Sequence, residues 1–120
     1  MKFRIWDKET EFFWGEGEGI ELFDCYANLT AIEKQRLIIQ PYVGQKDKHD
    51  KEIYVGDIVE YRGGKRVVKF GEFANGEDVF AGAFYLSDPQ IPRFGTARKS
   101  AFNQSKIVGN ILQNDYLVLK

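Results

Sequence analysis

Short runs of β-branched and aromatic residues alternate with polar, glycine-containing turns along the whole chain. Such runs predict strands, because β-branched and aromatic side chains pack well on a pleated surface. The strands predicted in the first part of the chain are 2–6, 11–14, 20–23 and 36–43. The first two flank a polar turn at 7–10, so we expect them to pair as an opening hairpin.

Residues 28–36 are compatible with two structures. Thr30 and Glu33 have the spacing of a capping box, which favours a short helix. Pro41 favours extended chain before it, because the residue preceding a proline avoids the helical region. We therefore expect irregular or briefly helical chain at 30–35, followed by the strand at 36–43.

The second part of the chain is expected to open with a meander of three antiparallel strands and to close with two more. These predicted strands are 57–61, 65–73, 79–86, 106–112 and 116–119. Asn75 and Gly76 separate the second and third of them, and both residue types tolerate the positive φ of a tight hairpin. Residues 87–104 are rich in proline and polar side chains, so we expect a long loop there.

Many short, closely spaced strands with glycine-rich turns predict a mainly β fold. We expect a single domain over residues 1–120, since this length is typical of one domain and 43% of the residues are apolar. An N-terminal β-hairpin region, residues 1–43, should pack on a small, strongly bent, SH3-like β-barrel formed by residues 44–120. The SH3-like label is an analogy of pattern, and a fold does not carry a function with it.

The residues that most catalytic and metal sites need are scarce. Cys25 is the only cysteine and His49 the only histidine, so an intrachain disulfide and a Cys/His zinc site within one subunit are excluded. A catalytic histidine would have to be His49, which lies in the most polar stretch of the chain, whereas a catalytic base must be held within hydrogen-bond reach of its nucleophile. The sequence also lacks a phosphate-binding glycine loop and a nucleophile elbow. We therefore expect no enzymatic activity, no catalytic residue, no metal site and no cofactor.

Membrane insertion and secretion are not expected either. No window approaches the roughly 20 apolar residues that cross a bilayer. The first residues lack the apolar run of a signal peptide. The sequence thus predicts a cytoplasmic protein that does not bind membranes.

Basic residues gather after the first strand of the meander, although the net charge of the chain is −1. Basic side chains interleaved with aromatics are what a single-stranded nucleic acid requires, charge for phosphates and flat faces for bases. The candidate nucleic-acid-binding residues are Arg62, Lys65, Arg66, Lys69, Arg93, Arg98 and Lys99. Against this interpretation, the pI of about 5.9 is low for a dedicated nucleic-acid-binding protein. Strand edges also carry lysine and arginine to discourage edge-to-edge pairing.

The aromatic side chains exceed what one small core can hold, since the chain has 10 Phe, 6 Tyr and 2 Trp. Consecutive aromatics, such as 12–14 and 84–85, must point to opposite faces of a strand. Aromatic surface is therefore expected to remain exposed, and its usual use is a protein interface. This favours a homo-oligomeric protein-interaction module, with nucleic-acid binding as the alternative.

Three segments, in order along the chain, together resemble one protein family. The first is residues 3–9. The second is residues 40–59, with Lys-Asp-Lys at 46–48, Lys-Glu-Ile-Tyr at 51–54 and Gly-Asp-Ile-Val at 56–59. The third is residues 107–111, followed by Asn114. These segments resemble the opening, the most recognisable motif and the closing Ile-Gly-Asn-Ile element of the YopX family of phage and prophage proteins.

The chain departs from the family pattern in two places. His49-Asp50 stands where the motif usually has an Asn-Gly turn, and Pro41 is an additional proline that interrupts what is normally an uninterrupted strand entry. We interpret the motif structurally, because Gly56 can adopt a conformation closed to other residues and Asp57 can accept bonds from neighbouring amides.

The resemblance implies a β-rich fold and a phage or prophage origin, and the family has no established activity from which residue roles could be transferred. The combined expectation is a non-enzymatic accessory protein that binds copies of itself or an unknown phage or host protein.

Overall fold

The computed structural model describes residues 3–14, 37–75, 77–91, 94–114 and 117 of the chain. The chain forms two compact units, residues 1–42 and 43–120. Of the predicted elements, the strand at 20–23 and the ambiguous segment at 28–36 lie outside the described residues.

The first unit contains β1 (Phe3–Asp7), β2 (Phe12–Trp14) and the first half of β3 (Leu37–Lys46). β1 pairs antiparallel with both neighbours. The turn between β1 and β2 is fixed by Asp7, whose Oδ1 accepts hydrogen bonds from the backbone N–H groups of Glu9 and Thr10. The predicted opening hairpin is confirmed.

Among its described residues, the second unit holds the other strands and one short helix. Its elements are β4 (Glu52–Tyr54), β5 (Asp57–Tyr61), β6 (Gly64–Asn75), β7 (Asp78–Ser87), β8 (Gly95–Thr96), α3 (Lys99–Gln104) and β9 (Lys106–Asn110). Five of these strands form one sheet in the order β8-β7-β6-β5-β9, and consecutive members are antiparallel. The predicted meander therefore corresponds to β5, β6 and β7.

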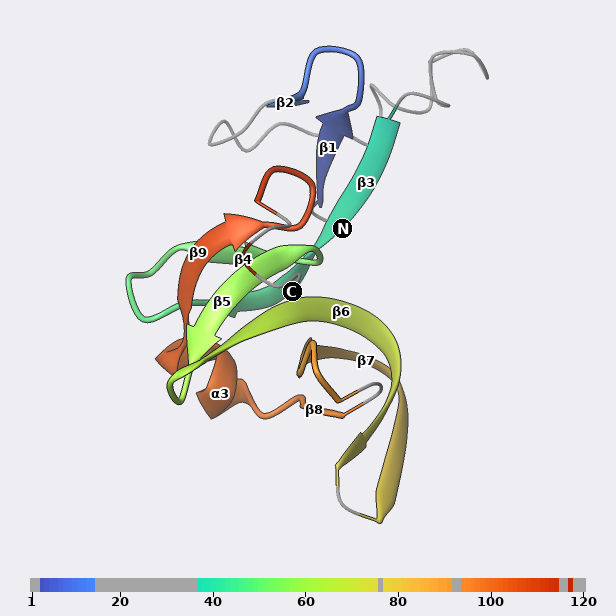
Figure 1. The fold of residues 1–120 in the computed structure, drawn as a ribbon, viewed down its shortest axis with the longest axis vertical. Helices are drawn as coiled ribbons and strands as arrows, with labels where there is room; N and C mark the ends of the chain where they lie inside the picture. Colours follow the sequence, from blue (N-terminus) through green and yellow to red (C-terminus); the bar gives the residue numbers. More distant parts are fainter. Residues whose placement is uncertain (1–2, 15–36, 76, 92–93, 115–116, 118–120) are drawn as a thin grey trace. The chain divides into compact units, whose positions relative to one another are not determined.

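β6 and β7 curl together along their length (Figure 1). The register shifts between Gly71 and Phe73, where Gly82 of β7 has a φ of 70°. An extra residue in one strand bends and twists the pair. The curl lets Ala74, near the end of β6, form a bridge with Phe94, just before β8. The mainly β, strongly bent fold is confirmed.

The core of the second unit joins residues from several elements. It consists of Val43, Ile53, Val59, Val68, Leu86, Ala101 and Phe102. Fully buried branched side chains of this kind each contribute about 1.5–3 kcal/mol relative to exposure. The helix belongs to the core through Ala101 and Phe102.

The predicted loop at 87–104 is wrong in its second half, which contains β8 and α3. The helix has six residues and no side-chain cap, so local sequence does not stabilise it. Burial of Ala101 and Phe102 against the sheet does so instead. The strand predicted at 106–112 ends at Asn110, and Leu117, within the strand predicted at 116–119, is not in a strand. No helix among the described residues is long and apolar enough to cross a membrane.

Candidate functional site

Arg62 and Gly63 form the two-residue connection between β5 and β6, and both have positive φ, 49° and 75°. Two positive values define the type I′ turn, in which Asn-Gly is the preferred pair. An arginine in this left-handed region lowers the stability of the folded state by roughly 1 kcal/mol. Arg62 is thus a poor residue for the turn itself, which makes it a candidate for a role in binding.

Arg62, Arg66 and Arg98 line one concavity of about 320 Å³ in the second unit, here called the arginine pocket. Two aromatic residues, Tyr61 and Phe94, also line it. The remaining lining residues are Asn75, Leu86, Asp88, Gly95 and Thr96.

The strand register explains why only some of the basic residues converge. Arg66 pairs with Val59, a core residue, so both side chains lie on the same face of the sheet. Lys65 and Lys69 are one and three residues away, and side chains alternate along a strand. They therefore project from the opposite face of β6.

The segment around β8 brings Arg98 to the pocket. Thr96 pairs with Leu86, and Gly95 lies so close to β7 that a Cβ there would be 2.5 Å from the Leu86 carbonyl oxygen. No side chain fits at such a distance, so glycine is required. Of the other candidates, Lys99 is exposed at the start of α3 and does not line the pocket, while Arg93 lies outside the described residues.

The three guanidinium groups retain capacity for a ligand. Arg66 donates one hydrogen bond, from Nη1 to the Lys65 carbonyl at 3.1 Å, although a guanidinium has five N–H donors. The Arg62 guanidinium lies 5.3 Å from the centre of the Tyr61 ring. Within the described part of the chain, none of the three makes an ion pair. Asp88 is the one carboxylate among the lining residues, so positive charge is in excess.

A second concavity of about 320 Å³ adjoins the first and shares Asn75, Thr96 and Arg98 with it. We call it the aromatic pocket, because Phe73 and Phe80 line it together with Asp78 and Ala97. The Phe73 ring is stacked between two others, with centroids 5.1 Å from Phe80 and 4.6 Å from Tyr85. Phe80 ends this column of rings and is 46% exposed.

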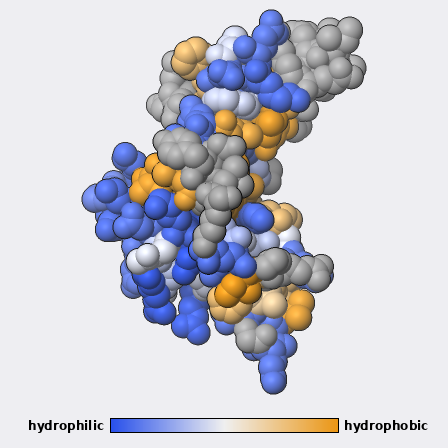
Figure 2. All heavy atoms as spheres, viewed as in Figure 1, coloured by the Kyte–Doolittle hydropathy of each residue, from blue (hydrophilic) through white to orange (hydrophobic). Residues whose placement is uncertain are grey.

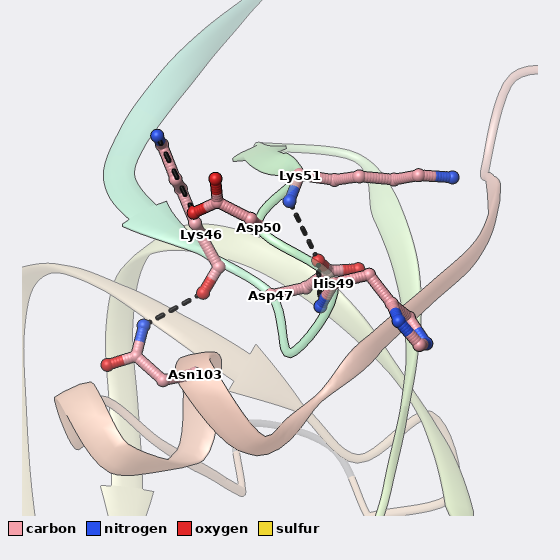
Figure 3. A network of polar contacts seen from close by, with 6 residues as sticks. All are labelled: Lys46, Asp47, His49, Asp50, Lys51 and Asn103. Atoms are coloured by element: carbon pink, nitrogen blue, oxygen red, sulfur yellow. Dashed lines mark hydrogen bonds and ion pairs between the residues drawn. The ribbon is translucent and has the colours of Figure 1, made fainter.

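The family motif in the middle of the chain serves the backbone and not either pocket. Asp47 is buried, and its Oδ1 accepts hydrogen bonds from the N–H groups of His49 and Lys51, both at 2.9 Å (Figure 3). Its Oδ2 accepts a third, from the N–H of Ile107 at 3.0 Å. Burial raises the pKa of Asp47, but these three bonds together outweigh burial and hold the pKa below its ordinary value.

A second buried carboxylate connects the middle motif to the closing one. Asp57 accepts hydrogen bonds from the Tyr54 N–H at 2.8 Å and from Nδ2 of Asn110 at 3.1 Å. Asn110 in turn accepts a bond from the N–H of Leu112, and Asn114 accepts one from the N–H of Asn110. The residues that carry the family resemblance therefore fix turns and strand ends.

Replacing Asp50 by glycine is expected to stabilise the protein by about 0.5 kcal/mol, because Asp50 has a φ of 63°. The ion pair that the change removes, Lys46 to Asp50 at 3.7 Å, is exposed and worth little (Figure 3). Urea denaturation measures the change. Lys51→Gly, at a position without positive φ, is the control and should destabilise instead. A midpoint that moves the same way for both variants would contradict the turn argument.

The sequence identified the three converging arginines but not the other features of the site. The curl of the sheet, which no local pattern encodes, adds Phe94, Asn75, Asp78 and Phe80 to the site.

Among the described residues, no group of three His, Cys, Asp or Glu side chains is placed to hold a metal ion.

Comparisons with known proteins bear on the whole chain. The sequence matches the family described as YopX protein over residues 2–118. The fold is similar to the crystal structure of protein EF1440 from Enterococcus faecalis, with a TM-score of 0.58 and 17% sequence identity. That similarity covers 98% of this chain and 97% of the other. No curated protein matches the sequence. The match to the family over nearly its full length confirms the resemblance of the three motifs, and the chain belongs to the YopX family.

Proposed function

We propose that this protein binds single-stranded nucleic acid in the arginine pocket, without catalysis, as an accessory protein of a phage or prophage. The observation that carries the proposal is the convergence of Arg62, Arg66 and Arg98 on one concavity that two aromatic rings also line. Guanidinium groups bind phosphates through paired N–H donors, and aromatic faces stack with bases of any sequence.

The conformation of Arg62 supports the same function. Its left-handed backbone costs stability that an asparagine would recover, so local folding does not explain the arginine. The overall acidity of the chain does not oppose the proposal, because a ligand responds to the local field, and lining arginines outnumber lining carboxylates.

The test is fluorescence anisotropy of a labelled oligothymidylate of about 15 nucleotides. If three phosphates are contacted, the logarithm of the association constant should fall with that of salt concentration with a slope of about −2. Between about 50 mM and 200 mM salt, affinity should then drop about 20-fold. Absence of binding at the lower salt would overturn the proposal.

Arg62→Asn separates binding from folding. The variant should weaken binding about 5- to 10-fold through loss of one phosphate contact, while the improved turn raises stability by about 0.5–1 kcal/mol. The matched control is Lys65→Ala, which removes the same charge from the opposite face of β6 and should leave binding unchanged. Equal losses for the two variants would indicate unspecific attraction.

Competition with an acidic peptide, which carries negative charge but no bases, tests whether the bases contribute to binding. Oligoglutamate of the same charge should compete poorly, because it cannot stack on Tyr61 or Phe94. If it competes as well as the oligothymidylate, the partner is an acidic protein segment and the nucleic-acid proposal fails.

We also propose self-association, which a separate observation favours. Phe70 of β6 is 57% exposed, and its ring centroid lies 4.9 Å from that of Phe84 on the neighbouring strand. Hydrophobic side chains are open to solvent near the end of the β6–β7 hairpin in Figure 2. Sedimentation equilibrium should show a dimer or larger species that Phe70→Ser shifts to monomer. A wild-type monomer at micromolar concentration would overturn this second proposal.

A further inference from the structure

We infer that the aromatic pocket is a seat for one base of the bound strand, and that the preferred base is guanine. This inference rests on the proposed function and adds a base preference to it. Arg98, Asn75 and Thr96 line both pockets, so a strand with its phosphates on the arginines reaches the aromatic pocket without leaving the protein surface.

The base would stack on a column of rings formed by Tyr85, Phe73 and Phe80. The interplanar angles within it are 21° and 20°, so the rings are nearly parallel. Phe80 is held from one side by Phe73 and is 46% exposed. A base stacked on Phe80 would extend the column by one ring.

Polar side chains line the aromatic pocket next to the exposed ring of Phe80. Asp78 and Phe80 are two residues apart on β7, so their side chains lie on one face, and Asn75 pairs with Asp78 across the hairpin. All three line the aromatic pocket. As far as the structure describes the chain, the side chains of Asn75 and Asp78 make no hydrogen bond or ion pair, so both are available to a ligand.

The Asp78 carboxylate determines which base can form hydrogen bonds in the aromatic pocket. An ionised carboxylate only accepts hydrogen bonds. Guanine presents two neighbouring donors on its pairing edge, N1–H and the N2 amino group, which two carboxylate oxygens can accept together. Adenine and cytosine place a ring-nitrogen acceptor beside their amino group, and thymine flanks its one N–H with two carbonyls, so each would bring an acceptor against Asp78.

The experiment compares oligothymidylate with the same oligonucleotide carrying one central guanine, adenine or cytosine, in the anisotropy assay above. A single guanine should raise affinity about tenfold, and adenine or cytosine should have little effect. Inosine, which lacks the N2 amino group, should give an intermediate value with the protein unchanged. Equal affinity for all four oligonucleotides would overturn the inference.

Two variants place the effect at the pocket. Asp78→Asn should abolish the guanine preference. It should also slightly strengthen binding of oligothymidylate, because it removes a negative charge from the aromatic pocket. Phe80→Ala should weaken all oligonucleotides by about 5- to 10-fold, whereas Val79→Ala, which points to the other face, should not. A guanine preference that survives Asp78→Asn would overturn the assignment.

The outcomes distinguish this inference from the function on which it rests. Oligothymidylate that binds in an Arg62-dependent way, without any gain from guanine, would leave the proposed function standing and remove the base seat. Failure of every oligonucleotide to bind would overturn both.

Discussion

Asp57→Ala is expected to destabilise the protein by about 3–4 kcal/mol, the largest effect of any substitution considered. The side chain is 1% exposed, and its oxygens accept bonds from the Tyr54 N–H and from the Asn110 side chain. Alanine would leave both donors facing a buried space, and each buried donor without a partner costs about 1–3 kcal/mol. Urea denaturation should show the loss as a lower midpoint.

The control is Asp88→Ala. Asp88 also accepts a backbone hydrogen bond, from the Gln90 N–H at 2.9 Å, but in an exposed setting where water can replace it. Its loss should cost less than about 1 kcal/mol. Similar midpoints for the two variants would show that the link between the middle and closing motifs does not stabilise the fold.

Asp47→Asn should lower stability by about 2–3 kcal/mol at neutral pH, and by progressively less as the pH falls from about 4 to about 2. The folded pKa of Asp47 lies below the ordinary value of 3.8, because three backbone bonds outweigh the effect of burial. A depressed folded pKa means that the stabilisation is complete above the unfolded pKa and is lost as pH falls through the folded pKa. The wild type should therefore approach the variant in acid.

The measurement is the difference in unfolding free energy between wild type and Asp47→Asn across that pH range. Asp50→Asn is the control, since its exposed ion pair with Lys46 contributes little at any pH. A difference that stays constant from about pH 7 to about pH 2 would rule out the ionised form of Asp47 as the stabilising species.

The hairpins could be predicted because the residues that define a hairpin, its two strands and its turn, lie close together in the sequence. Alternating side chains define β5, β6 and β7, but Asn75, which was expected in the turn, is the last residue of β6 and pairs with Asp78. Helix α3 could not be predicted in this way, because Ala101 and Phe102 are buried by strands distant in sequence. Tertiary packing overrides weak local preference in such short helices.

The candidate site was predicted in part, and the strand register explains the rest. A run of basic residues at 62–69 is visible in the sequence, but the pairing of Arg66 with Val59 decides that Arg66 faces the pocket. Arg98 and Phe94 reach the same pocket because Ala74 bridges to Phe94. That contact depends on the bend near Gly82, whose position a linear pattern does not reveal.

The hydrogen bond from the Ile107 N–H to Asp47 spans 60 residues, and the one from Asn110 to Asp57 spans 53. Contacts of such separation form late in folding, because the intervening chain must be ordered before they are gained. On the ribosome, β5 has no partner on its β9 side until the residues of β9, 106–110, have been synthesised. Until then the nascent protein carries an open strand edge, which exposes it to aggregation and to capture by chaperones.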